Sequence, residues 1–273
     1  MSFDYSSAFD LTGRTAVITG AAGILGQTFT KALLAHGASV VAVDRDFAGL
    51  EALAASLPEA ADRLMLSACD VTDGSQVCAM VDRTVARFEG IDILLNNHAT
   101  PPDDPAEFFA PFEDYSLEEW RRVMSVNLDG MFIVAQAVGR QMVAQARGGS
   151  MVFTTSIYGM MASDSRIYEG SEYRGYAINN PPVYSASKAG VVGLMRWLST
   201  YWAEKGIRVN AVAPGGVFSG ENDVFQKRYS ARVPLGRMAH EHEIAGGMLY
   251  LASDASSYVT GQVLMIDGGL SAW

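Results

Sequence analysis

The segment TAVITGAAGILG, residues Thr15–Gly26, carries the pattern that decides the fold. Its first half is a run of apolar and β-branched residues, which predicts a buried strand over Thr15–Thr19. Three glycines follow at intervals of three residues, and an amphipathic helical stretch then covers Gln27–His36. A strand, a glycine turn and a helix in this order predict the beginning of a βαβ unit.

The same alternation continues along the chain. Further strands are predicted at Ser39–Val43, Leu64–Ala68, Ile91–Leu95, Met151–Thr155, Arg208–Ala213 and Val263–Ile266. Helices are predicted at Gln76–Phe88, Leu117–Ala144, Val183–Lys205 and Glu241–Ala252. Nearly continuous apolar strands are typical of a parallel sheet buried on both faces. We therefore predict one α/β domain over residues 1–273, with a doubly wound, Rossmann-type sheet of seven parallel strands flanked by helices.

Two stretches break the alternation, and both follow strands. They are the segment 160–182, rich in Tyr, Ser, Asn and Gly, and the segment 215–237, which reads as a loop with room for a short helix. Ligands of open α/β sheets bind beyond the carboxyl ends of the strands. Both segments are therefore predicted to border a substrate pocket, as an insertion and a lid; ordinary surface loops are the alternative.

Composition narrows the class of protein. A net charge of −10 disfavours partners such as nucleic acid and anionic membranes, which reward a basic face. Cys69 and Cys78 form no cluster with the four scattered histidines, so we expect no metal site. Residues Met1–Thr12 lack the apolar core of a signal peptide, and no apolar run is long enough to span a bilayer. A cytoplasmic location is the expectation.

The glycine turn is typical of a pyrophosphate site. Glycines let backbone N–H groups approach phosphate oxygens, and the following helix adds the positive end of its dipole. Asp44 ends the second strand, where a carboxylate would accept hydrogen bonds from the adenosine ribose and repel a 2′-phosphate. We therefore favour NAD, although Arg45 could pair with the 2′-phosphate of NADP. The positions predicted to bind here are Gly20, Gly23, Ile24, Leu25, Gly26, Asp44 and Arg45.

Tyr184 and Lys188 stand four residues apart in a predicted helix and therefore share one helix face. A phenol with an ordinary pKa near 10 is a poor base at neutral pH. A neighbouring ammonium stabilises the phenolate and lowers that pKa, which makes the pair a candidate general acid/base.

From about Phe9 to Gly269 the sequence resembles the short-chain dehydrogenase/reductase family, and within it the main dehydrogenase branch with a Y-x-x-x-K motif. The resemblance rests on motifs in the family's order: the glycine turn, Asp70-Val71, Asn96-Asn97-His98-Ala99, Asn127, Ser156, Tyr184 with Lys188, Pro214-Gly215 and Ile266-Asp267-Gly268-Gly269. It implies strand order 3-2-1-4-5-6-7 and hydride transfer between a nicotinamide and a carbinol or carbonyl carbon.

The resemblance also implies a role for each matching position. Tyr184 would exchange the hydroxyl proton and Ser156 would bind the substrate oxygen. Lys188 would hold the nicotinamide ribose, and Asn127 would position a proton-relaying water. The further positions implied at the cofactor are Asp70, Val71, Asn97, Ala99, Pro214, Gly215 and Val217.

Three features depart from the family pattern. Ile24 takes the place of a usual glycine, and the resulting spacing is closer to that of sugar-nucleotide epimerases and dehydratases that retain NAD. His98 stands where a small residue is usual, either as packing or as a contact to ligand. The stretch between Ser156 and Tyr184 is longer than usual.

That insertion has a polar composition, which favours a polyhydroxylated substrate such as a sugar, sugar acid or polyol. Candidate substrate residues are His98, Tyr158, Arg174 and Asn179. The alternatives are an NAD-retaining epimerase or dehydratase, a reductase of a hydrophobic 3-oxoacyl or steroid-like ketone, and a catalytically silent NAD sensor. Helices Leu117–Ala144 and Val183–Lys205 are rich in small and apolar residues, and helices of this kind pair between subunits in the family. A homotetramer or dimer is therefore expected, with Leu270–Trp273 near a subunit contact.

Overall fold

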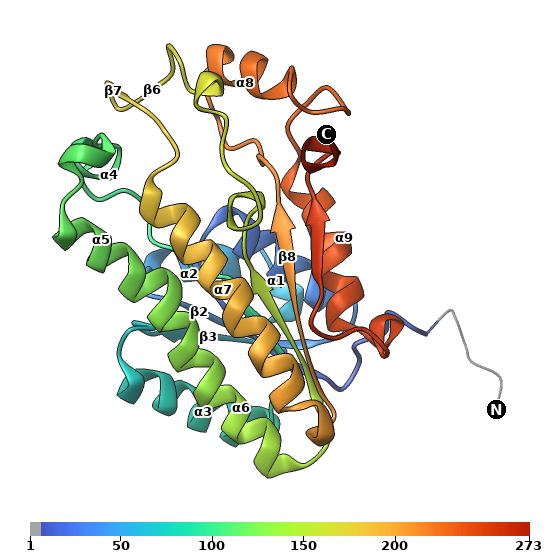
Figure 1. Ribbon diagram of the computed structural model, residues 1–273. Coiled ribbons are helices and arrows are strands. Elements are labelled where there is room, and N and C mark those ends of the chain that lie inside the picture. Colours follow the sequence, from blue (N-terminus) through green and yellow to red (C-terminus); the bar gives the residue numbers. More distant parts are fainter. Residues whose placement is uncertain (1–6) are drawn as a thin grey trace.

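The computed structural model describes residues 7–273, so half of the N-terminal segment inspected for a leader (residues 1–6) lies outside the described residues. Its main sheet has seven strands in the order β3-β2-β1-β4-β5-β8-β9, all paired in parallel (Figure 1). The strands are β1 (Thr15–Thr19), β2 (Ser39–Asp44), β3 (Leu64–Ala68), β4 (Ile93–Asn96), β5 (Gly149–Thr154), β8 (Ile207–Pro214) and β9 (Val263–Ile266). This confirms the predicted order, because β6 and β7 belong to a separate hairpin.

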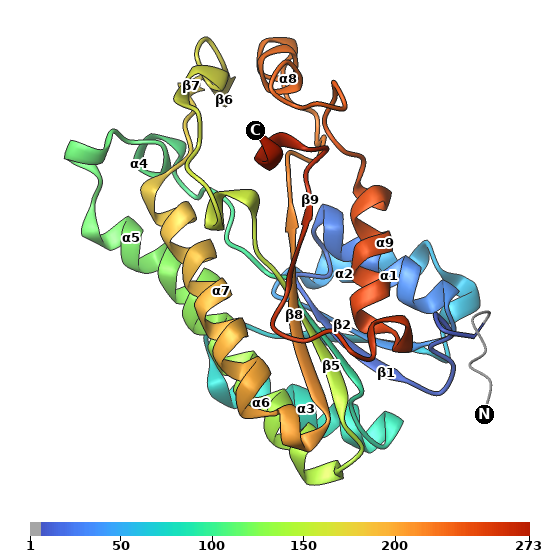
Figure 2. The same cartoon turned by 45° about the vertical axis from the view of Figure 1, so that its right-hand side comes forward.

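Helices cover both faces of the sheet (Figure 2). One face carries α1 (Ile24–Ala35), α2 (Phe47–Ala55) and α9 (Glu241–Ala252), whose apolar side chains form one core with Ala16 and Ile18 of β1. The opposite face carries α3 (Gly74–Phe88), α6 (Met131–Gln145) and α7 (Pro182–Tyr201), which pack on Val17 between those two residues. Because successive residues of a strand point to opposite faces, each buried strand supplies both cores.

The predicted boundaries are close to those observed. Strands β1, β3 and β9 and helix α9 have the predicted limits. Strand β4 begins two residues later than predicted because Ile91 and Asp92 precede its ladder, where the side chain of Asp92 accepts a hydrogen bond from the N–H of Thr15. Strand β4 thus begins immediately after the buried carboxylate of Asp92.

The long helix predicted over Leu117–Ala144 is interrupted. Helix α5 (Leu117–Met124) passes into a π-helical segment, η3 (Ser125–Gly130), before α6 begins at Met131. Sequence periodicity does not distinguish this wider turn from an ordinary helix. It matters because η3 carries Asn127, and π-helical turns frequently occur at functional sites.

The two irregular segments rise above the carboxyl ends of β5 and β8 (Figure 1). The first holds a small antiparallel hairpin of β6 (Glu172–Tyr173) and β7 (Tyr176–Ala177), which the sequence analysis did not anticipate. Arg174 and Gly175 form its turn, both with positive φ as such tight hairpins require. The second holds α8 (Asp223–Ser230), begun by Asn222, whose side chain accepts from the N–H of Phe225. On the other side of the hairpin stands the short helix α4 (Pro105–Phe108).

Candidate active site

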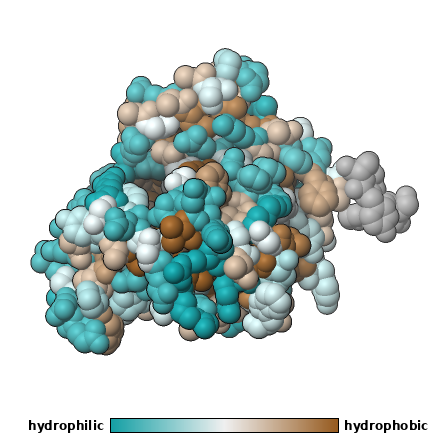
Figure 3. Space-filling view, turned by 90° about the horizontal axis from the view of Figure 1, so that it is seen from above, coloured by the Kyte–Doolittle hydropathy of each residue, from teal (hydrophilic) through white to brown (hydrophobic). Residues whose placement is uncertain are grey.

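A cavity of about 720 Å³ opens at the carboxyl ends of the strands, where the strand order reverses between β1 and β4. Seen from above, this end of the molecule mixes hydrophilic residues with smaller hydrophobic areas (Figure 3). The sequence-predicted residues that line the cavity are Gly20, Gly23, Ile24, Leu25, Gly26, Asp44, Arg45, Asn97, His98, Ala99, Ser156, Tyr184, Lys188, Pro214, Gly215 and Val217. Segments far apart in the sequence therefore meet around one space.

The glycine turn is shaped by close backbone approach. Gly20 has a φ of +68°, and a Cβ there would lie 2.8 Å from the Cα of His98. A Cβ on Gly26, in the first turn of α1, would lie 2.0 Å from the carbonyl oxygen of Gly20. Only glycine therefore fits at that position. No side chain caps the amino end of α1 at Gly23. The free N–H groups of that first turn suit an anionic ligand such as a pyrophosphate.

Asp44 lies beside this turn. Its Oδ2 accepts a hydrogen bond of 3.0 Å from the N–H of Ala22, and its Oδ1 accepts one of 3.0 Å from the N–H of Asp46. The carboxylate is thus held facing the cavity and keeps acceptor capacity on both oxygens. An adjoining cavity of about 270 Å³ extends to Asp70 and Val71, and shares Asp44 and Arg45 with the first. The two spaces together suit an elongated ligand.

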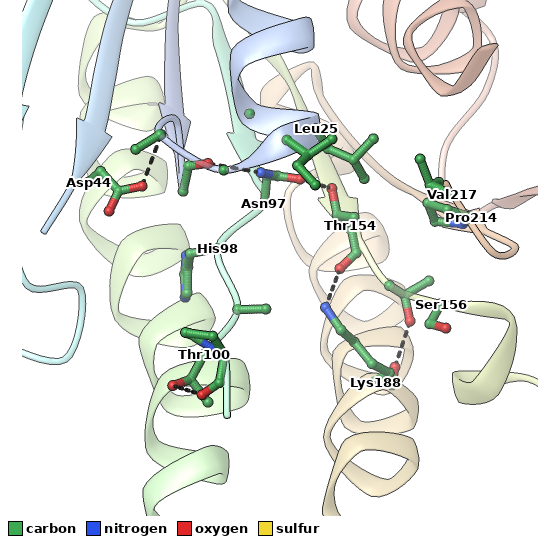
Figure 4. Close-up of a pocket in the computed structure, with 18 of the residues that line it drawn as sticks. Leu25, Asp44, Asn97, His98, Thr100, Thr154, Ser156, Lys188, Pro214 and Val217 are labelled. Atoms are coloured by element: carbon green, nitrogen blue, oxygen red, sulfur yellow. Dashed lines mark hydrogen bonds between the residues drawn. The ribbon is translucent and has the colours of Figure 1, made fainter. Parts of the chain in front are cut away.

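Ser156, Tyr184 and Lys188 all line the main cavity. Figure 4 shows Ser156 and Lys188 on the side of the cavity away from Asp44. Ser156 follows β5, while the other two lie on successive turns of α7. The hydroxyls of Ser156 and Tyr184 share a hydrogen bond. The Nζ of Lys188 donates to the carbonyl oxygen of Thr154 at 3.0 Å and lies 5.8 Å from the centre of the Tyr184 ring. A phenol, a hydroxyl and an ammonium therefore converge.

Burial shifts the acid strength of both groups on α7. Burial raises the pKa of Tyr184, and the hydrogen bond with Ser156 opposes that rise. Burial lowers the pKa of the Lys188 ammonium to about 8. The protein alone thus keeps the phenol protonated at neutral pH, and Lys188 is still mostly charged there.

Asn127 does not line the cavity but lies behind it, 1% exposed. Its Oδ1 accepts from the N–H of Thr100 at 2.9 Å, and its Nδ2 donates to the Oγ of Ser187 at 3.3 Å. The amide therefore joins the loop after β4 to the helix that carries Tyr184 and Lys188.

His98 lies in the cavity wall with both ring nitrogens hydrogen-bonded inside the protein. Nε2 lies 3.0 Å from the carbonyl oxygen of Val126, which can only accept, so Nε2 carries the proton. Nδ1 then accepts from the hydroxyl of Thr19 at 2.8 Å. Burial, with the nearby charge of Lys188, lowers the pKa of His98 to about 3. The neutral ring therefore joins β1 to η3, which favours the packing interpretation over contact with a ligand.

The other candidate substrate residues lie outside the main cavity. Tyr158 is nearest to the catalytic group, because its N–H donates to the Oγ of Ser156 at 3.2 Å. Arg174 lies at the exposed hairpin turn, with its guanidinium 5.1 Å from the centre of the Tyr173 ring. Asn179 donates to the carbonyl oxygen of Phe109 at 2.8 Å, and its buried Oδ1 has no partner among residues 7–273.

Several lining residues were not anticipated. They are Ala22, Asp46, Thr100, Pro101, Thr154 and Thr155. Thr154 contributes through its backbone carbonyl, and the side-chain hydroxyl of Thr155 donates to the carbonyl oxygen of Lys188 at 2.8 Å. Contacts of backbone atoms leave little trace in the type of residue, so no sequence signal marks them. Thr154 and Thr155 are suggested only by their place next to Ser156 at the end of β5.

Neither a metal site nor a membrane span is found in the described part of the chain. Over residues 7–273 no three His, Cys, Asp or Glu side chains are grouped so that they could hold a metal ion. Over the same range no helix combines the length and the apolar character that crossing a membrane requires.

The fold and this site define the class of protein: a Rossmann-type oxidoreductase with a nucleotide cavity and a Ser-Tyr-Lys group. Sequence comparison identifies the family. The family model described as enoyl-(acyl carrier protein) reductase matches residues 20–271. D-threitol dehydrogenase of Mycolicibacterium smegmatis is 35% identical, covering 98% of this chain and 96% of that protein. The 3-oxoacyl-(acyl-carrier-protein) reductase of Thermotoga maritima is 36% identical, covering 95% and 98%.

Solved structures agree with this assignment. A short-chain dehydrogenase from Leptospira borgpetersenii with bound NAD+ has a TM-score of 0.83 at 30% identity, covering 99% of this chain and 97% of its own. A gluconate 5-dehydrogenase from Burkholderia cenocepacia, in complex with NADP and tartrate, has a TM-score of 0.84 at 32% identity, covering 98% of each. The chain belongs to the short-chain dehydrogenase/reductase family, whose members act as oxidoreductases with a nicotinamide cofactor.

Proposed function

We propose that this protein interconverts a secondary alcohol and a ketone on a polyhydroxylated substrate, with NAD(H) as its cofactor. The observation that carries the proposal is the convergence of Ser156, Tyr184 and Lys188 in the cavity that also contains the glycine turn and Asp44. A catalytically silent sensor has no need of a buried ammonium beside a buried phenol, because burying such groups costs free energy.

The residues around the cavity fit a dinucleotide. The uncapped N–H groups of α1 would hold the pyrophosphate, and Asp70 and Val71 would flank the adenine. Asp44 would accept hydrogen bonds from the adenosine ribose, and its negative charge disfavours a 2′-phosphate. Lys188 would hold the second ribose, and Pro214, Gly215 and Val217 would border the nicotinamide. NAD is the cofactor we propose, although Arg45 borders the same cavity and would favour NADP.

The protein's own groups handle the proton. The nicotinamide, when bound, supplies or accepts the hydride. Ser156 donates a hydrogen bond to the substrate oxygen and holds it beside the hydroxyl of Tyr184. In oxidation Tyr184 takes the alcohol proton as a phenolate, a form that the charge of Lys188 stabilises and that the positive charge of an oxidised nicotinamide would favour further; in reduction the protonated Tyr184 donates that proton to the substrate oxygen. Asn127 keeps the loop after β4 and α7 in place and would orient a water behind Lys188.

The substrate class rests on two lines of support. The segment 160–182 is polar, and two of the compared proteins, D-threitol dehydrogenase and gluconate 5-dehydrogenase, are named for a polyol and a sugar acid. The similarity to a 3-oxoacyl reductase favours a second candidate, a reductase of acyl ketones. An apolar core of Ile157, Ile167 and Phe225 beneath the segment is compatible with either.

The test is turnover measured by NADH absorbance. The purified protein is offered D-threitol, other polyols and gluconate with NAD, and in parallel acyl and long-chain ketones with NADH. We expect turnover of at least one polyol or sugar acid, and loss of it in Tyr184→Phe, which keeps the ring and removes the reacting hydroxyl. Reduction of hydrophobic ketones with no oxidation of any polyol would overturn the substrate class.

We also propose that the chain forms a dimer or tetramer through α6 and α7. The exposed aromatic residues Phe132, Trp197 and Tyr201 border a groove of about 390 Å³ between these helices. Clusters of exposed aromatic side chains are typical of protein interfaces. Trp273 near the C-terminal end is also exposed, as expected of a residue near a subunit contact.

A further inference from the structure

Two phenols from the lengthened segment meet close to the catalytic hydroxyls. Tyr168 donates a hydrogen bond of 3.2 Å from its hydroxyl to the hydroxyl oxygen of Tyr158. Tyr158 stands two residues after Ser156, in the 3-10 turn η4 (Ile157–Gly159), and its N–H is bonded to the Oγ of Ser156. The position of the Tyr158 ring is thus tied to the residue that binds the reacting oxygen.

Tyr168 is held from behind by the lid. Its ring packs against Phe225 of α8 with centroids 5.6 Å apart, and Phe225 packs against Tyr229 at 5.7 Å. The hydroxyl of Tyr229 in turn accepts from the N–H of Gly216, just after β8. This row of rings connects the segment 160–182 to the loop beside the nicotinamide end of the cavity.

The same two segments are joined at the surface. Arg228 of α8 forms an ion pair of 3.0 Å with Glu169 and donates to the carbonyl oxygen of Arg166 at 2.9 Å. Exposed pairs of this kind contribute little energy individually. These contacts hold α8 in one position relative to the segment 160–182. The ring of Tyr168 therefore packs against Phe225 in one arrangement, and its hydroxyl keeps a constant position.

The hydroxyl of Tyr158 is an acceptor, and its own hydrogen is free to be donated to a ligand. Its oxygen accepts from Tyr168, and across residues 7–273 no acceptor for its own O–H is found. Burial raises the pKa of Tyr158 by more than the hydrogen bond from Tyr168 lowers it, so the hydroxyl keeps its proton. A half-buried donor without an acceptor, next to Ser156 and Tyr184, is suited to an oxygen of the substrate.

We infer that Tyr158, which flanks Ser156 beside the cofactor cavity and is not part of its lining, receives the substrate oxygen on the carbon adjacent to the reacting one, and that Tyr168 is the positioning residue that orients it. The inference rests on the proposed function and refines it, since it makes a vicinal oxygen a requirement. A site built to bond a hydroxyl rejects an analogue without one, because the buried donor is then left unpaired. The segment 160–182 would therefore select 1,2-diols and related polyols over simple alcohols.

The test compares two alcohols that differ by one oxygen, 2,3-butanediol and 2-butanol, with NAD. We expect the wild-type kcat/KM to favour the diol. Tyr158→Phe should lower the ratio of the two kcat/KM values about tenfold or more, mainly through the KM of the diol. Tyr168→Phe keeps the ring against Phe225 and should lower the same ratio by a smaller factor. The matched control is Tyr176→Phe, an exposed tyrosine of the hairpin, which should leave the ratio unchanged.

The outcomes separate the two proposals. An equal loss on both alcohols in Tyr158→Phe and Tyr168→Phe, or no loss on either, shows that the pair only supports the fold and overturns the inference while the proposed function stands. Absence of turnover with both alcohols and with every polyol removes the proposed function, and the inference with it. Thermal unfolding of each variant within about 2 °C of the wild type establishes that folding is preserved.

Discussion

At the scale of single residues, one carboxylate bears on the choice between two cofactors. Asp44 is held toward the cavity by the N–H groups of Ala22 and Asp46. Replacing Asp44 by Asn preserves its shape and removes its charge, and thereby the repulsion of a 2′-phosphate. We expect the ratio of kcat/KM for NAD over NADP to fall roughly 10- to 100-fold, because juxtaposed like charges cost several kcal/mol.

The matched control for this prediction is Asp46→Asn. Asp46 also borders the cavity, and its side chain caps α2 by accepting from the N–H of Gly49. It should affect the cofactor ratio much less. A wild-type enzyme that already prefers NADP would show that Arg45 decides the specificity instead.

The buried ammonium of Lys188 lowers the stability of the folded chain, while the proposed reaction requires it. Its pKa is about 8 in the folded chain against an ordinary 10.5, so below pH 8 the fold carries the full cost of a buried charge, about 3 kcal/mol. That cost fades as the pH rises from about 8 to 10.5, where the unfolded chain also loses the proton. Lys188→Met should therefore raise the free energy of unfolding at pH 7 by about 1–2 kcal/mol, after subtraction of the hydrogen bond to Thr154, while abolishing turnover.

The measurement is urea denaturation of the wild type and Lys188→Met, without cofactor, at pH 7 and pH 9.5. Because the charge cost falls by about 2 kcal/mol between these two pH values, the stability advantage of Lys188→Met should disappear or reverse at pH 9.5. A gap that stays constant with pH, or a variant less stable than the wild type at pH 7, contradicts this account.

At the scale of elements, α7 and the π-helical segment η3 hold the catalytic groups relative to one another. They approach closely at Gly190, where a Cβ would lie 2.9 Å from the Cδ2 of Leu128. Gly190→Ala should push η3 and its Asn127 away from α7. We expect a loss of about 1 kcal/mol in stability and a clear fall in kcat, measured by denaturation and by turnover on the same preparation.

The control is Gly246→Ala in α9, where an added Cβ meets no atom within 4 Å. That substitution should stabilise the protein by about 0.5–1 kcal/mol, because alanine is the better helix former, and leave kcat unaltered. An equal fall in kcat for both variants would show that the effect is not specific to the contact between α7 and η3.

At the scale of the whole molecule, the exposed face of α6 and α7 is the surface most suited to a second copy of the chain. Trp197 and Tyr201 are 60% and 62% exposed, and their rings stack at 4.6 Å. Trp197→Glu would bury a charge in the proposed interface. We expect light scattering to report a smaller species than the wild type, whereas Tyr258→Glu, at a fully exposed site elsewhere, leaves the assembly intact. A monomeric wild type would refute the assembly.

Much of the architecture could be predicted from the sequence, because the signals are local. Apolar strand runs predicted seven parallel strands, with β1, β3 and β9 correct to the residue, and the resemblance to the family implied the observed strand order. The missed features lie where tertiary contacts override local preference. The π-helical turn depends on buried contacts of Asn127 with Thr100 and Ser187, and the hairpin β6–β7 lies in a segment without regular periodicity.

The sequence by itself determined the chemistry available to this protein: a phenol and an ammonium one helical turn apart, a hydroxyl after a strand, and an acidic side chain after a glycine turn. Only the tertiary structure decided which groups are free to act. Both nitrogens of His98 are used inside the protein, Arg174 lies at a distant hairpin turn, and Tyr158 retains an unused donor. The physical reason is that hydrogen-bond satisfaction and burial depend on which atoms meet in space, and residues far apart in the chain supply those atoms.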